Sequence, residues 1–285
     1  MNHFKGTEVC LVAGNLGVLE AKFQNRHFDN PPGQSGTIGE FLGQIIFASQ
    51  ACEEAGMLEA VDFFNSIQLR LTDGIRVRRG QMESPALASE VRHARDVLAK
   101  SLQKRKFLYV APDRIDYIDQ KELFGTKVND AFDSAARDIE EAGNCFAAEC
   151  ATACVFHLMR AAEIALRAVA VDRNVSFATK PLDQQEWGTI LGALESVVTK
   201  MRADEIKKWP KPEVKDVQVR FYNEVVQELR GFNEAWRRHV AHARQDAIYD
   251  RDYAASVMGH VKKFMEKAAT KISESTATLL YWDVA

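Results

Sequence analysis

The sequence predicts an all-α protein, with an antiparallel helical bundle in its C-terminal half and an additional helical region before it. Apolar residues recur at intervals of three and four over most of the chain, which is the spacing of one face of a helix. Only 7 prolines and 16 glycines interrupt its 285 residues. The connections between the helical stretches of the C-terminal half are short, as in antiparallel bundles.

Composition places the chain among ordinary soluble proteins, with 46% hydrophobic and 27% charged residues. The formal net charge of -3 argues against a protein that coats nucleic acid nonspecifically, so any RNA contact should be local. The five cysteines are odd in number and are expected to stay reduced. No apolar run approaches the ~18 residues of a membrane span. We therefore expect a cytoplasmic protein with no membrane partner and no cofactor.

The N-terminal region is predicted to be mainly helical. Residues 7–17 form a short apolar run that ends in glycines, which favours a strand or a partly buried loop. Helical spacing then predicts one helix over 38–70 and another over 85–106. Pro112 marks a candidate boundary within 111–117. The predicted domains are residues 1–115, of unknown role, and residues 116–285.

The C-terminal region is predicted to contain long helices. Two of them, beginning near Phe124 and Cys145, should be separated near Gly143, with the second ending near Val171. The later pattern predicts helices over 186–201, 214–243 and 250–280.

Basic residues concentrate at the end of the helix predicted over 214–243. The segment Trp236 to Arg244 contains three arginines and two histidines within nine residues. A solvated helix end would account for them, because cations there interact with the helix dipole for ~0.3–1 kcal/mol each. Phosphate binding is the alternative, since arginine and histidine both donate hydrogen bonds to phosphate oxygens.

The order of helices and motifs resembles that of HEPN domains. Arg237, Arg238 and His242 follow the arginine, polar residue, histidine pattern of that family near the end of a long helix. The stretch from Phe156 to Glu163 is similar to its acidic second helix, and the helix after Asp250 is similar to the segment after its motif. The resemblance covers roughly residues 116–285.

The resemblance implies metal-independent RNA cleavage by a homodimer whose two motifs face each other. It also suggests a bacterial antiphage defence or toxin role, with a cognate antitoxin or defence-system partner. Inactive members of the family bind RNA or a nucleotide, so a noncatalytic interaction or assembly module is the alternative. Arg244 occupies the position where some toxins of this family carry a modified tyrosine, and Arg238 stands where the family commonly has asparagine.

In the expected mechanism, His242 transfers protons and Arg237 holds the phosphate. One histidine cannot be acid and base at once, so a dimer would supply both. Arg237 and His242 lie five residues apart, or about 140° around an ideal helix, which makes Arg238 a second candidate phosphate ligand. Arg238 and Arg244 are also expected to contact RNA.

Three further residues are candidates for supporting roles. Glu163 is either a surface acid or the group that orients Arg237 or His242. Arg160 could extend a basic cleft. Asn233 either contacts a phosphate or ribose or is an ordinary polar position.

Two other clusters have structural alternatives. Cys150, Cys154 and His157 would share a helix face and could form a zinc site, but small cysteines on a packed helix more often belong to a core. Lys207, Lys208 and the nearby Lys211 could guide an RNA backbone or could form a solvated surface. We predict no metal.

Overall fold

The computed structural model is all-α in the part of the chain that it describes, residues 6–24, 36–77, 84–105, 109–178, 180–241, 249–275 and 282. The predicted fold class is confirmed. The contacts divide the chain between Phe107 and Leu108 into two units, each with its own apolar core. None of the described helices is long and apolar enough to cross a bilayer.

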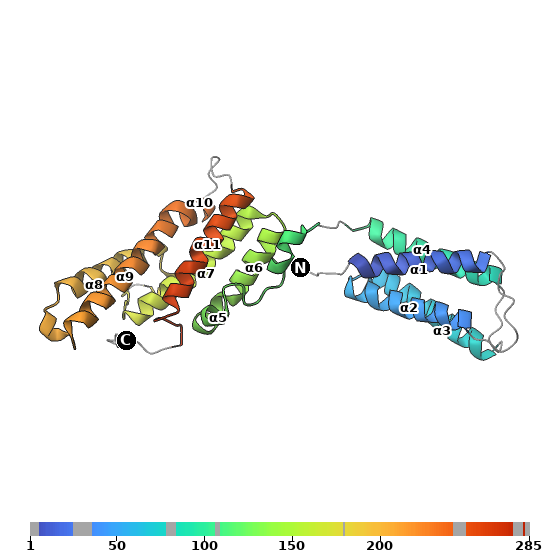
Figure 1. Ribbon diagram of the computed structural model, residues 1–285, viewed down its shortest axis with the longest axis horizontal. Coiled ribbons are helices and arrows are strands. Elements are labelled where there is room, and N and C mark those ends of the chain that lie inside the picture. Colours follow the sequence, from blue (N-terminus) through green and yellow to red (C-terminus); the bar gives the residue numbers. More distant parts are fainter. Residues whose placement is uncertain are drawn as a thin grey trace. The chain divides into compact units, whose positions relative to one another are not determined.

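In its described residues, the first unit has four helices around one core (Figure 1). They are α1 (Gly6–Gln24), α2 (Gly36–Glu54), α3 (Leu58–Val77) and α4 (Ser84–Gln103). Helix α1 packs against α4 and α2, and α3 packs against α2 and α4. Glu20 on α1 joins Arg92 and Arg95 on α4 at 2.9 and 2.7 Å, which ties the first helix to the last.

The strand or loop predicted over residues 7–17 is wrong, because this segment lies within α1. Val12, Leu16 and Leu19 are buried at helical spacing, while Leu11 and Val18 are more than half exposed. Apolar residues on several sides of the helix hid the periodicity. Few polar residues mark the solvent face, so a short window could not separate a helix from a buried strand.

The single helix predicted over residues 38–70 is also wrong, because it divides into α2 and α3 at Gly56. Gly56 has a φ of 65°, in the left-handed region where glycine is not penalised. Its N–H donates to the carbonyl of Glu53 at 2.9 Å, and the N–H of Met57 donates to that of Cys52 at 2.7 Å. These two bonds form a Schellman motif, which ends α2.

The second unit is a bundle of five longer α-helices with short helical turns between them (Figure 1). Its buried apolar residues form one core, which draws on positions from Phe124 to Ile272 and on Trp282. The longer helices are α6 (Ala136–Ala147), α7 (Ala151–Asp172), α8 (Trp187–Ala203), α9 (Pro212–Phe232) and α11 (Arg251–Ala268). The shorter elements are η1 (Pro112–Tyr117), α5 (Thr126–Ala131), η2 (Asp133–Ala135), η3 (Leu182–Gln184), η4 (Ile206–Lys208), η5 (Asn233–Arg237) and α10 (Arg238–Ala241).

Helix α7 is the centre of this bundle. It packs against α6, α8, α9, α10 and α11. Its buried residues include six alanines, whose small side chains let several helices approach one helix closely. Every polar group that α7 carries toward a neighbour must therefore find a partner there or reach solvent.

The helix break predicted near Gly143 is wrong, because α6 continues through Gly143 and ends at Ala147. A Cβ atom at position 143 would lie 2.7 Å from the carbonyl oxygen of Tyr117. Glycine is therefore needed where η1 packs on α6, not where the helix ends. The break follows at residues 148–150, where Glu149 has a φ of 59°.

The last helix ends earlier than the predicted residue 280. Helix α11 begins after Asp250, whose carboxylate accepts the N–H of Tyr253 at 2.8 Å, and ends at Ala268. Beyond it, the N–H of Glu274 donates to the carbonyl of Ala131 at 2.9 Å. The carboxylate of Glu274 accepts the N–H of Ser134 at 3.0 Å. This segment is therefore fixed on the α5 side of the bundle.

Candidate nucleic-acid interface

The basic segment predicted as a site begins in a turn of π-helix. Helix α9 passes into η5, where the N–H of Arg238 donates to the carbonyl of Asn233, five residues earlier. A π turn places an extra residue in the helix and shifts the register of all that follows, and such turns are frequent at functional sites. Asn233 consequently lies one turn before Arg238, and not before Arg237 as in an ideal α-helix.

Aromatic packing holds this turn in place. Trp236 stacks on Phe232, with ring centroids 5.1 Å apart and an interplanar angle of 23°. Phe232 in turn meets Phe264 of α11 edge-on at 5.2 Å, and the ring of His260 lies 5.8 Å from Trp236. This stack packs Trp236 against the core of the second unit.

The arginines along α9 and η5 differ in their partners. Arg230 donates to Glu195 of α8 and forms an ion pair with Glu234 at 3.4 Å. The hydrogen bond to Glu195 raises the pKa of Arg230. Arg237 is half-buried and Arg238 is exposed, and neither has an ion-pair or hydrogen-bond partner for its side chain among the described residues. Positive charge is thus neutralised at Arg230 and has no described partner about two turns later, at Arg237 and Arg238.

The supporting residues predicted on α7 form bonds with other groups. Glu163 accepts from Arg167 at 2.6 Å, and Arg167 also donates to the carbonyl of Asp183 at 3.0 Å. Arg160 donates to Asp138 of α6. Helix α7 packs against both η5 and α10, but no described hydrogen bond joins Glu163 or Arg160 to Arg237. His242 and Arg244 lie outside the described residues.

An unpredicted cluster lies between α6 and α7. Asp138 is only 8% exposed, and its Oδ1 atom lies 2.8 Å from both Nδ1 of His157 and Nε of Arg160. The hydrogen bond to Asp138 raises the pKa of Arg160. Spacing along one helix could align His157 with Arg160, but their common partner is on another helix. Sequence reasoning missed it for that reason.

A second buried carboxylate lies at the other end of α7. Asp172 accepts from the Tyr222 hydroxyl at 2.6 Å and from Nε of Arg173 at 2.8 Å. The guanidinium carbon of Arg173 lies 4.3 Å from the centre of the Tyr222 ring, and Trp282 donates to the Tyr222 hydroxyl at 3.4 Å. Burial raises the pKa of Tyr222. The cluster joins α7, α9 and Trp282.

Of the two cysteines on the predicted face, Cys154 contributes to packing and Cys150 is exposed. Cys154 is fully buried, and burial raises the pKa of its thiol to about 12. Burial also raises the pKa of Cys145. His157 is bound to Asp138, and the described residues contain no group of three metal-ligating side chains. Cys154 therefore behaves as a small core residue and not as a thiolate ligand.

The lysines near η4 are partly neutralised. Lys207 pairs with Glu205 at 2.5 Å, and Lys208 pairs with Asp204 at 3.5 Å. A shallow hollow nearby, of about 410 Å³, is lined by residues of α8 and α9. Three of its lining residues are cations: Arg202, Lys215 and Arg220. Asp216 also lines this hollow, and Lys215 donates to the main-chain carbonyls of Arg202 and Asp204.

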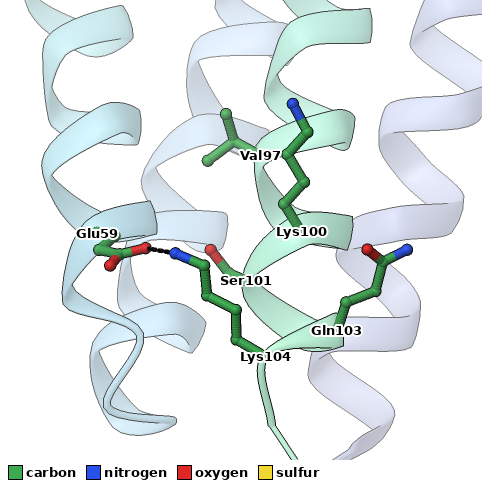
Figure 2. A pocket seen from close by; sticks show the side chains of 6 residues that line it. All are labelled: Glu59, Val97, Lys100, Ser101, Gln103 and Lys104. Carbon is green, nitrogen blue, oxygen red and sulfur yellow. Dashed lines mark hydrogen bonds and ion pairs between the residues drawn. The ribbon is translucent and has the colours of Figure 1, made fainter.

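The first unit has a comparable hollow between α3 and α4 (Figure 2). Lys104 and Glu59 form an ion pair at 2.5 Å across it, and Lys100 and Gln103 extend along its α4 side. Each of the two paired side chains is more than half exposed, so the pair contributes little to stability. Ser101, which is 4% exposed, is the one buried polar residue among those that line this hollow. We assign the hollow no chemistry.

The chain matches no family model, no curated protein and no solved structure.

Proposed function

We propose that this protein is a metal-independent endoribonuclease that acts as a homodimer. The observation that carries the proposal is the pair Arg237, the last residue of the π turn, and Arg238, directly after it. Neither has a carboxylate partner among the described residues. Elsewhere in the second unit, arginines are commonly paired with acids: Arg114, Arg160, Arg167, Arg173, Arg230 and Arg251. Two guanidinium groups adjacent in the sequence and without acidic partners are better explained by binding of an anionic ligand than by a structural role.

The sequence places His242 a few residues beyond these arginines. In the proposed reaction, the ribose 2′-oxygen attacks the adjacent phosphorus as a histidine takes its proton. The bond from phosphorus to the 5′-oxygen breaks, and that oxygen receives a proton from a second histidine. The products are a 2′,3′-cyclic phosphate and a free 5′-hydroxyl. Arg237, with Arg238 as a co-ligand, stabilises the charge on the phosphate oxygens.

A second copy of the chain supplies the second histidine in this proposal. Two copies of the segment 233–242 facing each other would place one His242 on either side of the phosphate. RNA is the proposed substrate, and the proposed context is bacterial antiphage defence or a toxin with a cognate antitoxin.

The proposal is tested by RNA cleavage in EDTA with purified full-length protein. His242→Ala and Arg237→Ala should each reduce cleavage by about 100-fold or more, because each removes a group that acts in the transition state. Arg220→Ala is the matched control, since Arg220 is an exposed α9 arginine without a described ion pair. Cleavage that persists in the His242→Ala protein would reject the mechanism.

A noncatalytic RNA- or nucleotide-binding module is the second candidate. It is favoured by the positions of Glu163 and Arg160, whose bonds to Arg167 and Asp138 leave neither of them oriented toward Arg237. In that case, the protein would bind RNA with a steep salt dependence and would not cut it. A single chain would then bind RNA without forming a dimer.

A further inference from the structure

The cluster between α6 and α7 has the geometry of a histidine oriented by a carboxylate. Asp138 is an acceptor when ionised, so the 2.8 Å contact to Nδ1 of His157 places the imidazole proton on Nδ1. The other ring nitrogen, Nε2, then carries a lone pair. No described residue bonds to it, and the His157 side chain is 26% exposed. The imidazole therefore offers one fixed nitrogen to a ligand.

Arg160 adds a donor beside that nitrogen. Its Nε atom bonds to both carboxylate oxygens of Asp138, at 2.8 and 3.1 Å. No described residue bonds to its two terminal nitrogens, and 58% of its side chain is exposed. Asp138 thus holds two neighbouring side chains through hydrogen bonds on their buried side, and both keep polar atoms that can reach solvent.

An exposed aromatic ring completes the surface. Phe156 is 45% exposed, although it lies within a helix that is otherwise largely buried. Its ring centre is 5.9 Å from the His157 ring and 6.0 Å from the guanidinium carbon of Arg160. A large apolar ring next to an oriented imidazole and a guanidinium is the combination that stacks a base and binds its phosphate.

Structural stability does not require this arrangement. Helices α6 and α7 already share an extensive apolar contact through residues such as Ile139, Ala142 and Leu158. A buried carboxylate at such a contact is costly to desolvate, and apolar residues of similar size would serve stability as well or better.

We propose that Phe156, His157 and Arg160, positioned by Asp138, form a nucleotide-binding site on the α6 and α7 face. The base stacks on Phe156, the phosphate accepts hydrogen bonds from the terminal nitrogens of Arg160, and Nε2 of His157 accepts a hydrogen bond from an N–H of the base. The ligand is a nucleotide unit, either free or as part of an RNA strand. This site does not depend on the proposed ribonuclease activity.

The test is titration of the full-length protein with AMP, inorganic phosphate and a short 2′-O-methyl RNA. The RNA probe cannot be cut by 2′-hydroxyl attack, so it reports binding alone. Phe156→Ala and Arg160→Gln should each weaken nucleotide binding about tenfold or more, as expected for loss of a stacking ring or a phosphate donor. His157→Asn should do the same, because asparagine can keep the bond to Asp138 but lacks Nε2.

The matched control is Arg137→Gln, which removes an exposed arginine next to Asp138 that has no ion pair among the described residues, and it should leave binding unchanged. Titration with AMP should also shift the Nε2 resonance of His157 and not that of His93, which packs on Phe63 in the first unit. Binding of AMP would identify a site for free nucleotides, and binding of the RNA alone would identify a site for a strand.

Two outcomes would overturn the inference. One is that the parent protein binds none of the probes, or that the three variants bind every probe as tightly as the parent protein does. The other is inorganic phosphate binding as tightly as AMP, because the base would then contribute nothing. His242→Ala protein separates this site from the ribonuclease: it should lose cleavage and keep AMP binding, so either proposal can fail without the other.

Discussion

Helix α7 takes part in two clusters that each contain a buried carboxylate, and the partners of the two carboxylates differ in exposure. Asp138 binds an arginine and a histidine near the beginning of α7, and Asp172 binds an arginine and a tyrosine at its end. The side chain of Arg160 is 58% exposed, whereas that of Arg173 is 7% exposed. Tyr222 is fully buried beneath Trp282. The same polar chemistry is thus open to solvent in one cluster and sealed in the other.

This difference separates a structural role from a binding role. In the Asp172 cluster, the Tyr222 hydroxyl and Nε of Arg173 occupy the buried carboxylate, so a ligand could reach it only by breaking a buried bond. In the Asp138 cluster, the carboxylate is buried but its partners keep polar atoms that reach solvent. Burial of the acid is shared by both clusters, so exposure of its partners is the distinguishing property.

The largest expected effect is on the sealed cluster. Asp172→Ala should lower the free energy of unfolding by about 3–5 kcal/mol, because it leaves the buried guanidinium of Arg173 without its carboxylate. Denaturant unfolding of the full chain measures this change. A loss below about 1 kcal/mol would mean that the cluster is not sealed in solution.

A smaller effect is expected for Tyr222→Phe, which removes the hydroxyl that donates to Asp172. The free energy of unfolding should fall by about 1–3 kcal/mol near neutral pH. Because burial raises the pKa of Tyr222, the unfolded chain loses this proton first as the pH rises. Stability from this group is therefore complete below pH ~10 and decreases above it. Thermal unfolding between neutral and alkaline pH should show a shallower decline for Tyr222→Phe than for the parent protein.

The open cluster should tolerate the same type of change. Asp138→Ala should cost about 1 kcal/mol or less, because Arg160 and His157 can turn to water once the carboxylate is removed. Nucleotide binding should nevertheless weaken, since Asp138 positions both side chains. Paired unfolding and titration experiments measure the two quantities. A destabilisation as large as that of Asp172→Ala would remove the distinction between the clusters.

The smallest stability change is expected at Arg238, which is exposed and has no described partner. Arg238→Ala should change the free energy of unfolding by less than about 0.5 kcal/mol. If Arg238 contacts a phosphate, RNA affinity should fall. The slope of log affinity against log salt concentration should also become smaller in magnitude by about 1. An unchanged slope would show that Arg238 does not bind the RNA backbone.

Much of the fold was predictable, but the ends of its elements were not. Helical spacing predicted α4, α8 and the long α9 segment, whose buried residues lie on one face. The predicted helix ends were wrong at Gly56 and at Gly143. One ends a helix through a left-handed turn and the other admits the backbone of Tyr117. Composition cannot distinguish these two uses, because they depend on what lies beside the residue.

The candidate site divides in the same way. The density of arginine and histidine after Trp236 was visible in the sequence, and the absence of described acidic partners for Arg237 and Arg238 was not. The π turn at Asn233 depends on how Trp236 packs against Phe232 and α11, so no spacing rule along one helix could give it.

The sequence by itself determined an all-helical chain and the positions of its basic segment and its histidines. Local periodicity and composition carry that information, because each depends on residues a few positions apart. Only the tertiary structure decided that Asp138 holds His157 and Arg160 while Asp172 is sealed beneath Tyr222 and Trp282. Those partners are separated by up to 60 residues in the sequence and meet only when the helices pack. The exposure and charge pairing of these residues therefore depend on the tertiary structure.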